Sequence, residues 1–314
     1  TNVSAINLRG LIFVEQGDYI KAIEEYSKGI TLKEVDPEGA GYCYRNRAEQ
    51  FINLNQLNKA QNDIDSAVAI DPNNTDMYYV RAKFNSEIKI DFGKALLDYD
   101  KIIYLAQDNE WAWYYRADFY ENKLKDNKNA LADFNKCVEL NPERFLIERA
   151  KFYYRQKDFK NSKKDYNLLV DLDENNPESY NERGLFLGLI GEYDKAHQDF
   201  EKSIYLDTNS TSVYYYRIKI FEKQGLSEKQ KADLEKTIQM DPNDPEGYYY
   251  LAILYENQER YYKVISNFKD AIRCLEENSN YYVSDDNGEK ISNYKIYLKV
   301  AETFKKIDEP EDMC

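Results

Sequence analysis

The stretch Tyr180–Phe200, Y-N-E-R-G-L-F-L-G-L-I-G-E-Y-D-K-A-H-Q-D-F, contains the pattern that decides the fold. A small residue, Gly184, is followed twelve residues later by a second one, Ala196, and four residues after that by the large apolar Phe200. The first of these landmarks recurs with steps of 38, 34, 35, 33, 34, 34 and 34 residues. Its positions are Gly10, Ala48, Ala82, Ala117, Ala150, Gly184, Ile218 and Ala252. A near-constant period of this length indicates a repeat architecture.

The second landmark and the large apolar residue keep the same distance from each other in every repeat. The second landmark stands at Ala22, Ala60, Ala95, Ala130, Ser162, Ala196, Gln230 and Val264. The large residue stands at Tyr26, Ile64, Tyr99, Phe134, Tyr166, Phe200, Leu234 and Phe268. Spacings of three, four and seven place apolar residues on one face of a helix. Each repeat is therefore predicted to be two amphipathic helices joined by a short turn, and prolines such as Pro72 and Pro242 end the second helix.

Two charged positions repeat with the landmarks. The residue before the first landmark is Arg9, Arg47, Arg81, Arg116, Arg149, Arg183 and Arg217, but Leu251 in the eighth repeat. The residue three after the second landmark is Glu25, Asp63, Asp98, Asp133, Asp165, Asp199 and Asp233, but Asn267 in the eighth. Because both charges disappear together, we predict a guanidinium–carboxylate pair between the two helices of each repeat. The alternative is a row of arginines that binds an acidic ligand.

At these positions the chain resembles the tetratricopeptide repeat (TPR) family, whose unit is a helix–turn–helix of about 34 residues. An aromatic residue precedes the small residue by four places at Tyr44, Tyr78, Trp113, Tyr180, Tyr214 and Tyr248. Another follows it by three places at Phe13, Phe51, Tyr120, Tyr153, Phe221 and Tyr255. The resemblance covers about residues 3–278. It implies an all-α, right-handed superhelical solenoid of about eight repeats.

The expected units cover residues 3–40, 41–74, 75–109, 110–142, 143–176, 177–210, 211–244 and 245–278. A polar linker is expected at 279–290, and a capping helix with a tail at 291–314, because the last unit of a stack needs a polar outer face. Three departures from the period stand out. Four residues are inserted near 34–41, the loop before Phe145 is two residues short, and the aromatic Phe84 comes one place early.

In TPR proteins the first helices line the groove that holds partners, so the resemblance implies a groove surface. Its expected residues are Tyr42, Arg45, Glu49, Tyr79, Lys83, Trp111, Tyr114, Asp118, Arg144, Lys151, Tyr154, Tyr215, Lys219 and Tyr249. Tyr and Trp offer a large contact area and a polar tip, which suits a binding surface. The competing interpretation is that about half of these side chains pack neighbouring helices together.

Composition argues against several function classes. With 57 acidic and 43 basic residues the net charge is -14, which disfavours nucleic acid and anionic lipid. The single histidine, His197, and the absence of nucleotide, hydrolase or metalloprotease motifs leave no expected catalytic, cofactor or metal site. Cys43, Cys137 and Cys274 are expected to be buried thiols and Cys314 a terminal one. No apolar run is long enough to span a membrane.

These observations predict a non-catalytic scaffold that binds a protein or peptide partner in the groove. Two alternatives remain at this point: a structural protein that self-associates through the ends or the convex face of the solenoid, and an enzyme that uses groove carboxylates or tyrosines. The scattered cysteines favour a reducing compartment such as the cytoplasm, with an exported form that has lost a leader as the alternative.

Overall fold

The computed structural model describes residues 2–277, 282–284, 290–291, 295–297, 299–300 and 302–303. Within them, helices follow one another in eight pairs. These are α1 (Val3–Glu15) and α2 (Tyr19–Ile30); α3 (Pro37–Asn53) and α4 (Leu57–Ile70); α5 (Thr75–Lys83), continued by η1 (Phe84–Lys89), and α6 (Phe92–Leu105); α7 (Glu110–Phe119), continued by η2 (Tyr120–Leu124), and α8 (Asn127–Leu140); α9 (Pro142–Arg155) and α10 (Phe159–Leu172); α11 (Pro177–Leu189) and α12 (Tyr193–Leu206); α13 (Ser212–Lys223) and α14 (Ser227–Met240); α15 (Pro245–Glu256) and α16 (Tyr261–Glu277).

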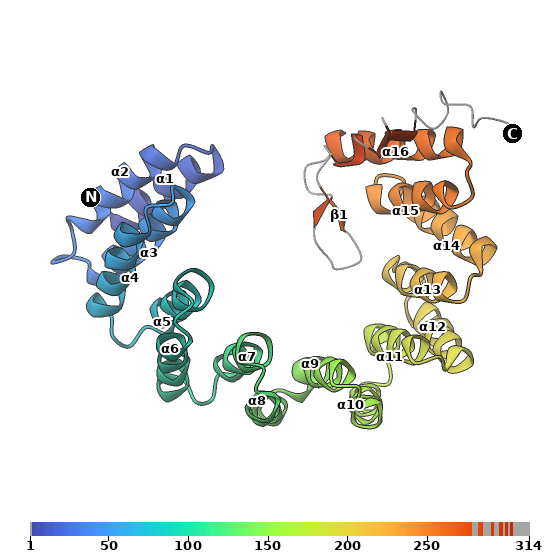
Figure 1. The fold of residues 1–314 in the computed structure, drawn as a ribbon, viewed down its shortest axis with the longest axis horizontal. Helices are drawn as coiled ribbons and strands as arrows, with labels where there is room; N and C mark the ends of the chain where they lie inside the picture. The colour runs from blue at the N-terminus through green and yellow to red at the C-terminus, as the bar shows by residue number, and fades with distance from the viewer. Residues whose placement is uncertain are drawn as a thin grey trace, which may run out of the picture. The chain divides into compact units, whose positions relative to one another are not determined.

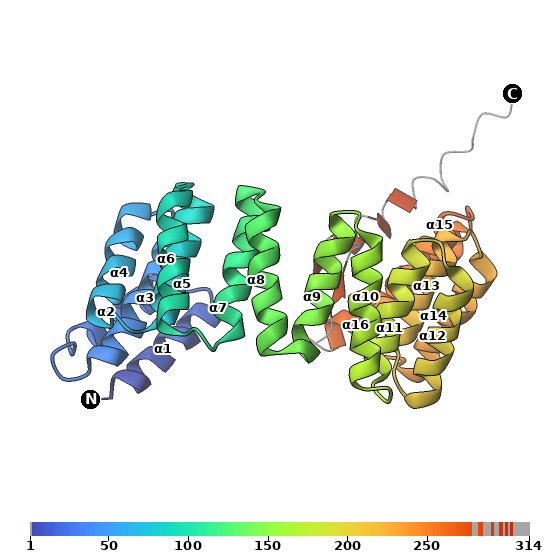
Figure 2. The ribbon, with the colours of Figure 1, turned by 90° about the horizontal axis from the view of Figure 1, so that it is seen from below.

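The predicted all-α repeat fold is confirmed, since the described helices pack in successive pairs (Figure 1). The chain divides into two compact units, Thr1–Phe152 and Tyr153–Cys314. Within the first unit, α1, α3, α5 and α7 form one layer and α2, α4, α6 and α8 the other. Figure 2 shows the two helices of a pair lying alongside each other, as α5 and α6 do. We call the exposed side of the first layer the first-helix face.

The small landmarks lie where the two helices of a pair come closest. A Cβ atom on Gly184 would lie 2.8 Å from Cε1 of Phe200, and the alanines at this position are fully buried. A larger side chain would push the helices apart, because protein interiors are close-packed. The pattern of small and large residues in the sequence is therefore the contact surface between the two helices of each repeat.

The inserted residues change the repeats locally. The four extra residues near 34–41 form one more turn at the start of α3, so the first repeat ends at Asp36 rather than at residue 40. The short loop before Phe145 is the single residue Asn141 between α8 and α9. In the third and fourth repeats, thirteen residues instead of twelve separate the two landmarks, and the extra residue is taken up by the π-helical segments η1 and η2.

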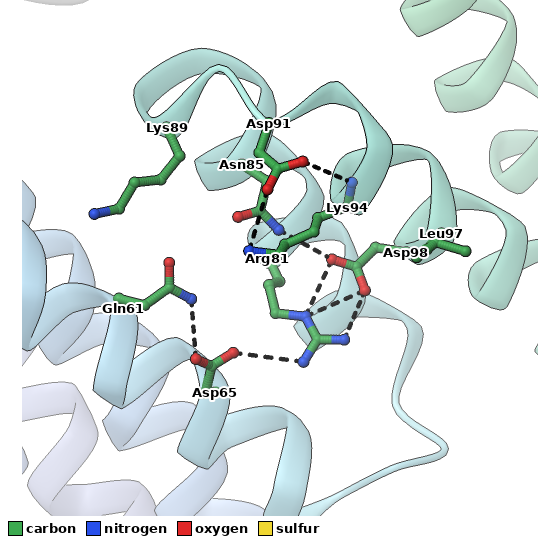
Figure 3. A pocket seen from close by; sticks show the side chains of 9 residues that line it. All are labelled: Gln61, Asp65, Arg81, Asn85, Lys89, Asp91, Lys94, Leu97 and Asp98. Atoms are coloured by element: carbon green, nitrogen blue, oxygen red, sulfur yellow. Dashed lines mark hydrogen bonds and ion pairs between the residues drawn. The ribbon is translucent and has the colours of Figure 1, made fainter.

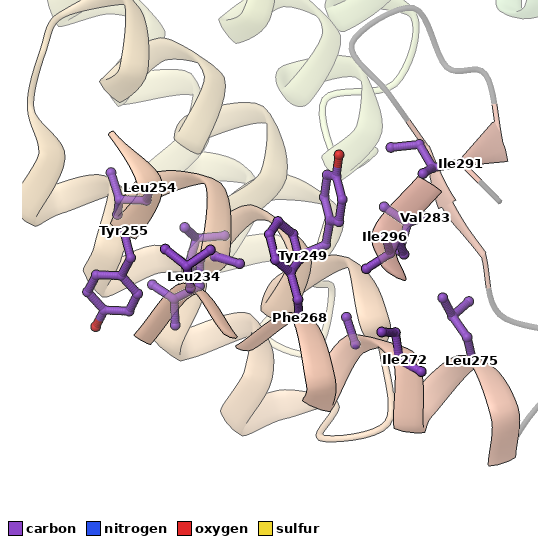
Figure 4. Packing of buried hydrophobic residues seen from close by; sticks show 14 of the residues in the cluster. Leu234, Tyr249, Leu254, Tyr255, Phe268, Ile272, Leu275, Val283, Ile291 and Ile296 are labelled. Atoms are coloured by element: carbon purple, nitrogen blue, oxygen red, sulfur yellow. The ribbon is translucent and has the colours of Figure 1, made fainter. Parts of the chain in front are cut away.

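The C-terminal prediction needs a correction in its described part. The segment expected to be only a polar linker contains β1 (Val283–Ser284) and β2 (Lys290–Ile291), which pair antiparallel. Val283, Ile291 and Ile296 are buried against α15 and α16 (Figure 4). Burial of these apolar side chains on the last repeat stabilises the contact of β1 and β2 with it. Residues 295–297, 299–300 and 302–303 have helical backbone, and the rest of the expected capping helix lies outside the described residues.

The guanidinium groups of the charge ladder lie against the predicted carboxylates. Arg47 donates from Nε to Asp63 Oδ2 at 2.7 Å and from Nη2 to Oδ1 at 2.8 Å. Both carboxylate oxygens are likewise engaged where Arg81 meets Asp98, Arg116 meets Asp133, Arg183 meets Asp199 and Arg217 meets Asp233. Arg9 places Nε and Nη2 on one oxygen of Glu25, Oε2. In the remaining predicted pair, that of the fifth repeat, Arg149 lies in the first compact unit and Asp165 in the second. Two parallel N–H···O bonds to one carboxylate are the geometry that Arg favours.

Each arginine from the second repeat to the sixth also reaches back to the preceding repeat, which the sequence pattern did not predict. Nη1 of Arg116 donates to Asp100 at 2.7 Å, and Nη1 of Arg81 lies 3.5 Å from Asp65 (Figure 3). The acceptors of the other three, Arg47, Arg149 and Arg183, are Ser27, Asn135 and Asn167. All five acceptors lie five residues after a second landmark. We call this arrangement the arginine clamp, because one side chain bridges two consecutive repeats.

Burial changes the pKa of two clamp carboxylates and of the three buried cysteines. Burial raises the pKa of Asp98 and of Asp133, although hydrogen bonds from the paired arginines oppose this shift. It also raises the pKa of Cys43 to about 11 and that of Cys137 to about 12. Cys274 is buried as well, and its pKa is raised for the same reason.

Removing one clamp carboxylate should destabilise the protein. Asp63→Ala leaves Arg47, whose side chain is 19% exposed, without its bidentate partner, and we expect this to cost roughly 3 kcal/mol of unfolding free energy in urea titrations. Glu139→Ala is the control, because the Lys136–Glu139 pair is exposed, and it should change stability by less than about 0.5 kcal/mol. Equal effects of the two substitutions would contradict the role given to the clamp.

The turn between the helices provides a second test. One residue per repeat adopts the left-handed conformation with φ of 55–88°: Gly17, Asn55, Ile90, Lys125, Lys157, Gly191, Gly225 and Glu259. Ile90 is the unfavourable case, because it is β-branched and 61% exposed. Ile90→Gly should raise the unfolding free energy by about 1 kcal/mol. Lys89→Gly, next to it in η1, should lower it by a similar amount. A stability loss in Ile90→Gly would show that Ile90 is not strained.

The raised thiol pKa values predict inert cysteines. At pH 8, almost none of Cys43 or Cys137 is the reactive thiolate in the folded protein. In a Cys314→Ser variant, a thiol-specific reagent should therefore label none of the three remaining cysteines until denaturant is added. Labelling of one cysteine per chain under native conditions would mean that a buried site opens.

Candidate functional site

Two adjoining cavities lie on the first-helix face of the first unit. The first, about 510 Å³, lies between α3 and α5 with η1, and we call it cavity A. Its lining consists of Arg45, Ala48, Glu49, Ile52, Asn53, Asp76, Tyr79, Val80, Lys83, Phe84, Glu87 and Ile88. The second, about 240 Å³, lies between α5 with η1 and α7 with η2, and we call it cavity B. Its lining consists of Tyr79, Lys83, Ser86, Glu87, Tyr99, Tyr114, Tyr115, Asp118, Phe119 and Lys123.

Cavity A has an apolar lining and charged groups around it. Ile52, Val80 and Ile88 are partly buried, and Phe84 is buried against Ile64 and Ala60 of the second repeat. Glu49, Asp76, Lys83 and Glu87 are exposed. Burying an apolar side chain in such a cavity is favourable by about 0.8 kcal/mol per CH₂ group, while the charged groups fix the orientation of the chain that carries it.

Cavity B is lined by phenol groups. The rings of Tyr79 and Tyr115 lie 4.3 Å apart between centroids, and Tyr99 is buried beneath them. Burial raises the pKa of all three tyrosines, so their hydroxyl groups are neutral at physiological pH. Neutral phenols both donate and accept hydrogen bonds, whereas Asp118 only accepts and Lys123 only donates. Cavity B therefore suits a polar group or a peptide backbone.

The segment η1 connects the two cavities. It provides Phe84 and Ile88 to cavity A, Ser86 to cavity B, and Glu87 to both. The extra residue of the third repeat is what converts this helix end from α to π geometry. The irregularity at Phe84 in the sequence is thus the place where the two cavities meet.

An aromatic cluster extends the surface beyond cavity B within the first unit. Trp111 lies 5.4 Å from Tyr114 and 5.4 Å from Phe145, between ring centroids. The guanidinium of Arg144 lies 4.6 Å from the centre of the Trp111 ring, within the range of a cation–π contact. Trp111 and Tyr114 are partly exposed beside the phenols of cavity B, whereas Phe145 is buried.

Six expected groove residues lie at the two cavities: Arg45, Glu49, Tyr79, Lys83, Tyr114 and Asp118. Tyr42 lies beside them, stacked under Arg45 at 5.1 Å, and Trp111 and Arg144 form the aromatic cluster. Lys151 is partly buried and lines neither cavity.

The four expected groove residues of the second unit have different surroundings. Tyr154 packs against Phe159 and Phe186, and Tyr215 donates a 2.9 Å hydrogen bond to Asp244. Lys219 is exposed. Tyr249 requires a correction, because it is only 7% exposed: it packs on Phe268 in the cluster that includes Val283 and Ile291. Val283, Ile291 and Ile296 belong to the same cluster, which the repeat pattern alone could not show.

Sequence reasoning missed several lining residues. Tyr115, Val80 and Ile88 lie outside the positions expected to face the groove, and Glu87 was not among the expected residues. Glu87 and Ile88 belong to the π-helical segment η1, and the landmark spacing of thirteen instead of twelve is the signal that locates this segment. Tyr115 could have been found from its place in the aromatic run W-A-W-Y-Y at residues 111–115.

A further cavity of about 660 Å³ surrounds the clamp of Arg81 (Figure 3). Asp65 and Asp98 accept hydrogen bonds from Arg81, and Lys94 pairs with Asp91. Because these charges satisfy one another, they favour the structural role of the arginines over a row of ligand-binding cations. Among the described residues, no three potential ligand side chains gather as a metal site requires. The described helices are also too short or too polar to cross a bilayer.

Models of the tetratricopeptide repeat match residues 3–36, 112–144, 143–176, 177–210 and 234–265. Among solved structures, a tetratricopeptide repeat protein from Parabacteroides merdae ATCC 43184 is similar at 22% identity and a TM-score of 0.50, over 76% of this chain and 93% of that one. Yeast Tom70 is similar at 18% identity and a TM-score of 0.63, over 99% of this chain and 66% of that one. No curated protein matches the sequence. The repeat matches and the helix pairs together establish that the chain belongs to the tetratricopeptide repeat family.

Proposed function

We propose that the chain is a non-catalytic scaffold that holds a segment of a partner protein on the first-helix face of its first unit. The observation that carries this proposal is the pair of adjoining cavities that share Tyr79, Lys83 and Glu87. The family supports the general role, since its repeats are protein-interaction modules. The two cavities add a defined binding site to this general role.

The chemistry of the cavities suggests what the partner segment carries. An aliphatic or aromatic side chain fits cavity A, where Ile52, Val80 and Ile88 would exclude water from it. The neighbouring backbone or a polar side chain would then reach the phenols of cavity B. Lys83 and Glu87, which lie at both cavities, have opposite charges, so neither an acidic nor a basic segment is excluded by charge.

Catalysis has little support at this site. Neither cavity is lined by His or Cys, and the raised pKa values of Tyr79, Tyr99 and Tyr115 keep their hydroxyl groups protonated at physiological pH, so no phenolate is present to accept a proton. The hydroxyl of Ser86 donates to the carbonyl of Lys83 at 3.1 Å, and no base among the lining residues is hydrogen-bonded to it. Binding is therefore the function that this arrangement supports best.

The test begins with capture of partners on the immobilised protein, followed by calorimetric titration with peptides that tile the captured partner. Tyr79→Ala should weaken binding at least tenfold, because it removes a ring that both cavities share. Lys83→Ala should weaken it by a smaller factor. Tyr104→Ala, on the exposed side of α6 and outside both cavities, is the matched control and should leave the affinity unchanged.

Urea unfolding should accompany each titration, because Tyr79 also packs on Tyr115. Lys83 is exposed, and its contacts are the Tyr79 ring, 5.9 Å from its ammonium, and Glu87 at 3.9 Å. Exposed contacts of this kind contribute little to stability, so the Lys83 substitution tests the site even if Tyr79→Ala is destabilised. A peptide that binds both variants as tightly as the wild type would place the binding site elsewhere.

A further inference from the structure

Aromatic rings make up half of the lining of cavity B. Five of its ten lining residues are aromatic: Tyr79, Tyr99, Tyr114, Tyr115 and Phe119. They come from three helices, α5, α6 and α7, so the rings approach the cavity from more than one direction. Tyr79 is tilted by 35° and Tyr114 by 63° relative to the ring plane of Tyr115. A small cavity is therefore surrounded by several ring surfaces.

Two exposed carboxylates, Glu87 and Asp118, lie at the same cavity. Burial is the main cause of the raised pKa of Tyr79 and of Tyr99, and the charges of the two carboxylates raise both further. No positive charge among the described residues lowers the pKa of Tyr79 in return. Because the faces of aromatic rings also carry negative potential, cavity B favours a positively charged group.

One of the lysines at cavity B shows how such a group is accommodated. Nζ of Lys83 lies 3.9 Å from Oε1 of Glu87 and 5.9 Å from the centre of the Tyr79 ring. The protein thus already places one ammonium group beside a carboxylate and an aromatic ring of this cavity. The second lysine, Lys123, is exposed and makes neither contact within the described part of the chain.

Asp118 is the carboxylate of cavity B that can receive a cation from outside. It accepts a 2.7 Å hydrogen bond from the neutral amide of Asn122, and no cation pairs with it among the described contacts. On α7 it follows Tyr114 by four residues and Tyr115 by three, which are the spacings that bring side chains together on a helix. A carboxylate and two partly exposed rings therefore lie side by side without a cation between them.

We propose that cavity B binds the alkylammonium end of a lysine, unmodified or methylated, in the partner segment, with Asp118 beside it and the rings of Tyr114 and Tyr115 against it. This proposal rests on the proposed function, since the same segment would place an apolar side chain in cavity A. A cation close to an aromatic ring is attracted by the quadrupole of the ring, and the attraction is stronger where water is excluded. The neighbouring carboxylate adds a direct charge interaction.

Amino-acid probes test this cavity before any partner is known. The probes are the Nα-acetyl amides of lysine, trimethyllysine and norleucine, the last of which has a neutral side chain, and ligand-observed NMR titration measures their binding. The better of the two cationic probes should bind with a dissociation constant on the order of 1 mM, about fivefold more tightly than norleucine. Tighter binding of trimethyllysine assigns the cavity to methylated lysine, and tighter binding of lysine assigns it to the unmodified residue.

Matched variants separate the cavity from the general attraction of an acidic chain for cations. Asp118→Asn should weaken the cationic probe about threefold, because it removes one charge and keeps the size of the side chain. Glu139→Gln changes the net charge equally at an exposed position outside the cavity and should leave the affinity unchanged. Tyr115→Phe should keep the affinity and Tyr115→Leu should lower it, since the ring and not the hydroxyl group attracts the cation. Asp118 is exposed, so its variant remains informative if Tyr115→Leu unfolds.

Three results would overturn the lysine assignment: norleucine binds as tightly as the cationic probes, no probe binds at concentrations up to about 20 mM, or Glu139→Gln weakens binding as much as Asp118→Asn does. The peptide titrations keep this failure apart from a failure of the proposed function. A partner peptide that needs Tyr79 but keeps its affinity when its lysines are replaced by norleucine contradicts the lysine assignment and leaves the scaffold function standing.

Discussion

The guanidinium groups of the clamp arginines impose the main constraint on this structure. Arg116 contacts the second helix of its own repeat through Asp133 and the second helix of the preceding repeat through Asp100. One planar side chain therefore fixes the distance between the helices of a pair and the register between pairs. Arg is suited to this because its five donors are arranged in a rigid plane and it stays charged even when half-buried. A lysine would satisfy one acceptor and leave the others to water.

The clamp also limits where the fold can vary. The third and fourth repeats contain an extra residue, yet Arg81 and Arg116 still meet Asp98 and Asp133, so the insertion is displaced to the end of the first helix. There it forms η1 and η2, and η1 lies between the two cavities. The candidate binding site is thus a local consequence of keeping the ion pairs while lengthening the helix.

Much of the fold could be predicted because its determinants are local and periodic. The spacing of Gly184, Ala196 and Phe200 is enough to place two helices and their contact. The acceptors of the clamp in preceding repeats were missed because they require knowledge of how repeats stack, which a period within one repeat does not contain. Tyr249 was wrongly predicted to face the groove for a related reason. Val283, Ile291 and Ile296, which share its buried cluster, follow the last repeat and belong to no repeating pattern. The cavities depend on the extra residue of the third repeat, which the sequence records only as a landmark spacing of thirteen instead of twelve and which does not by itself show a cavity.

The most direct test of the clamp is hydrogen exchange in an Arg116→Met variant. If Arg116 joins two repeats, amide exchange should accelerate in α6, where Asp100 lies, as well as in α7 and α8, while α1 and α2 keep the protection they have in the wild type. Acceleration confined to α7 and α8 would mean that the guanidinium holds together only its own helix pair, and the account of how the repeats are kept in register would be wrong.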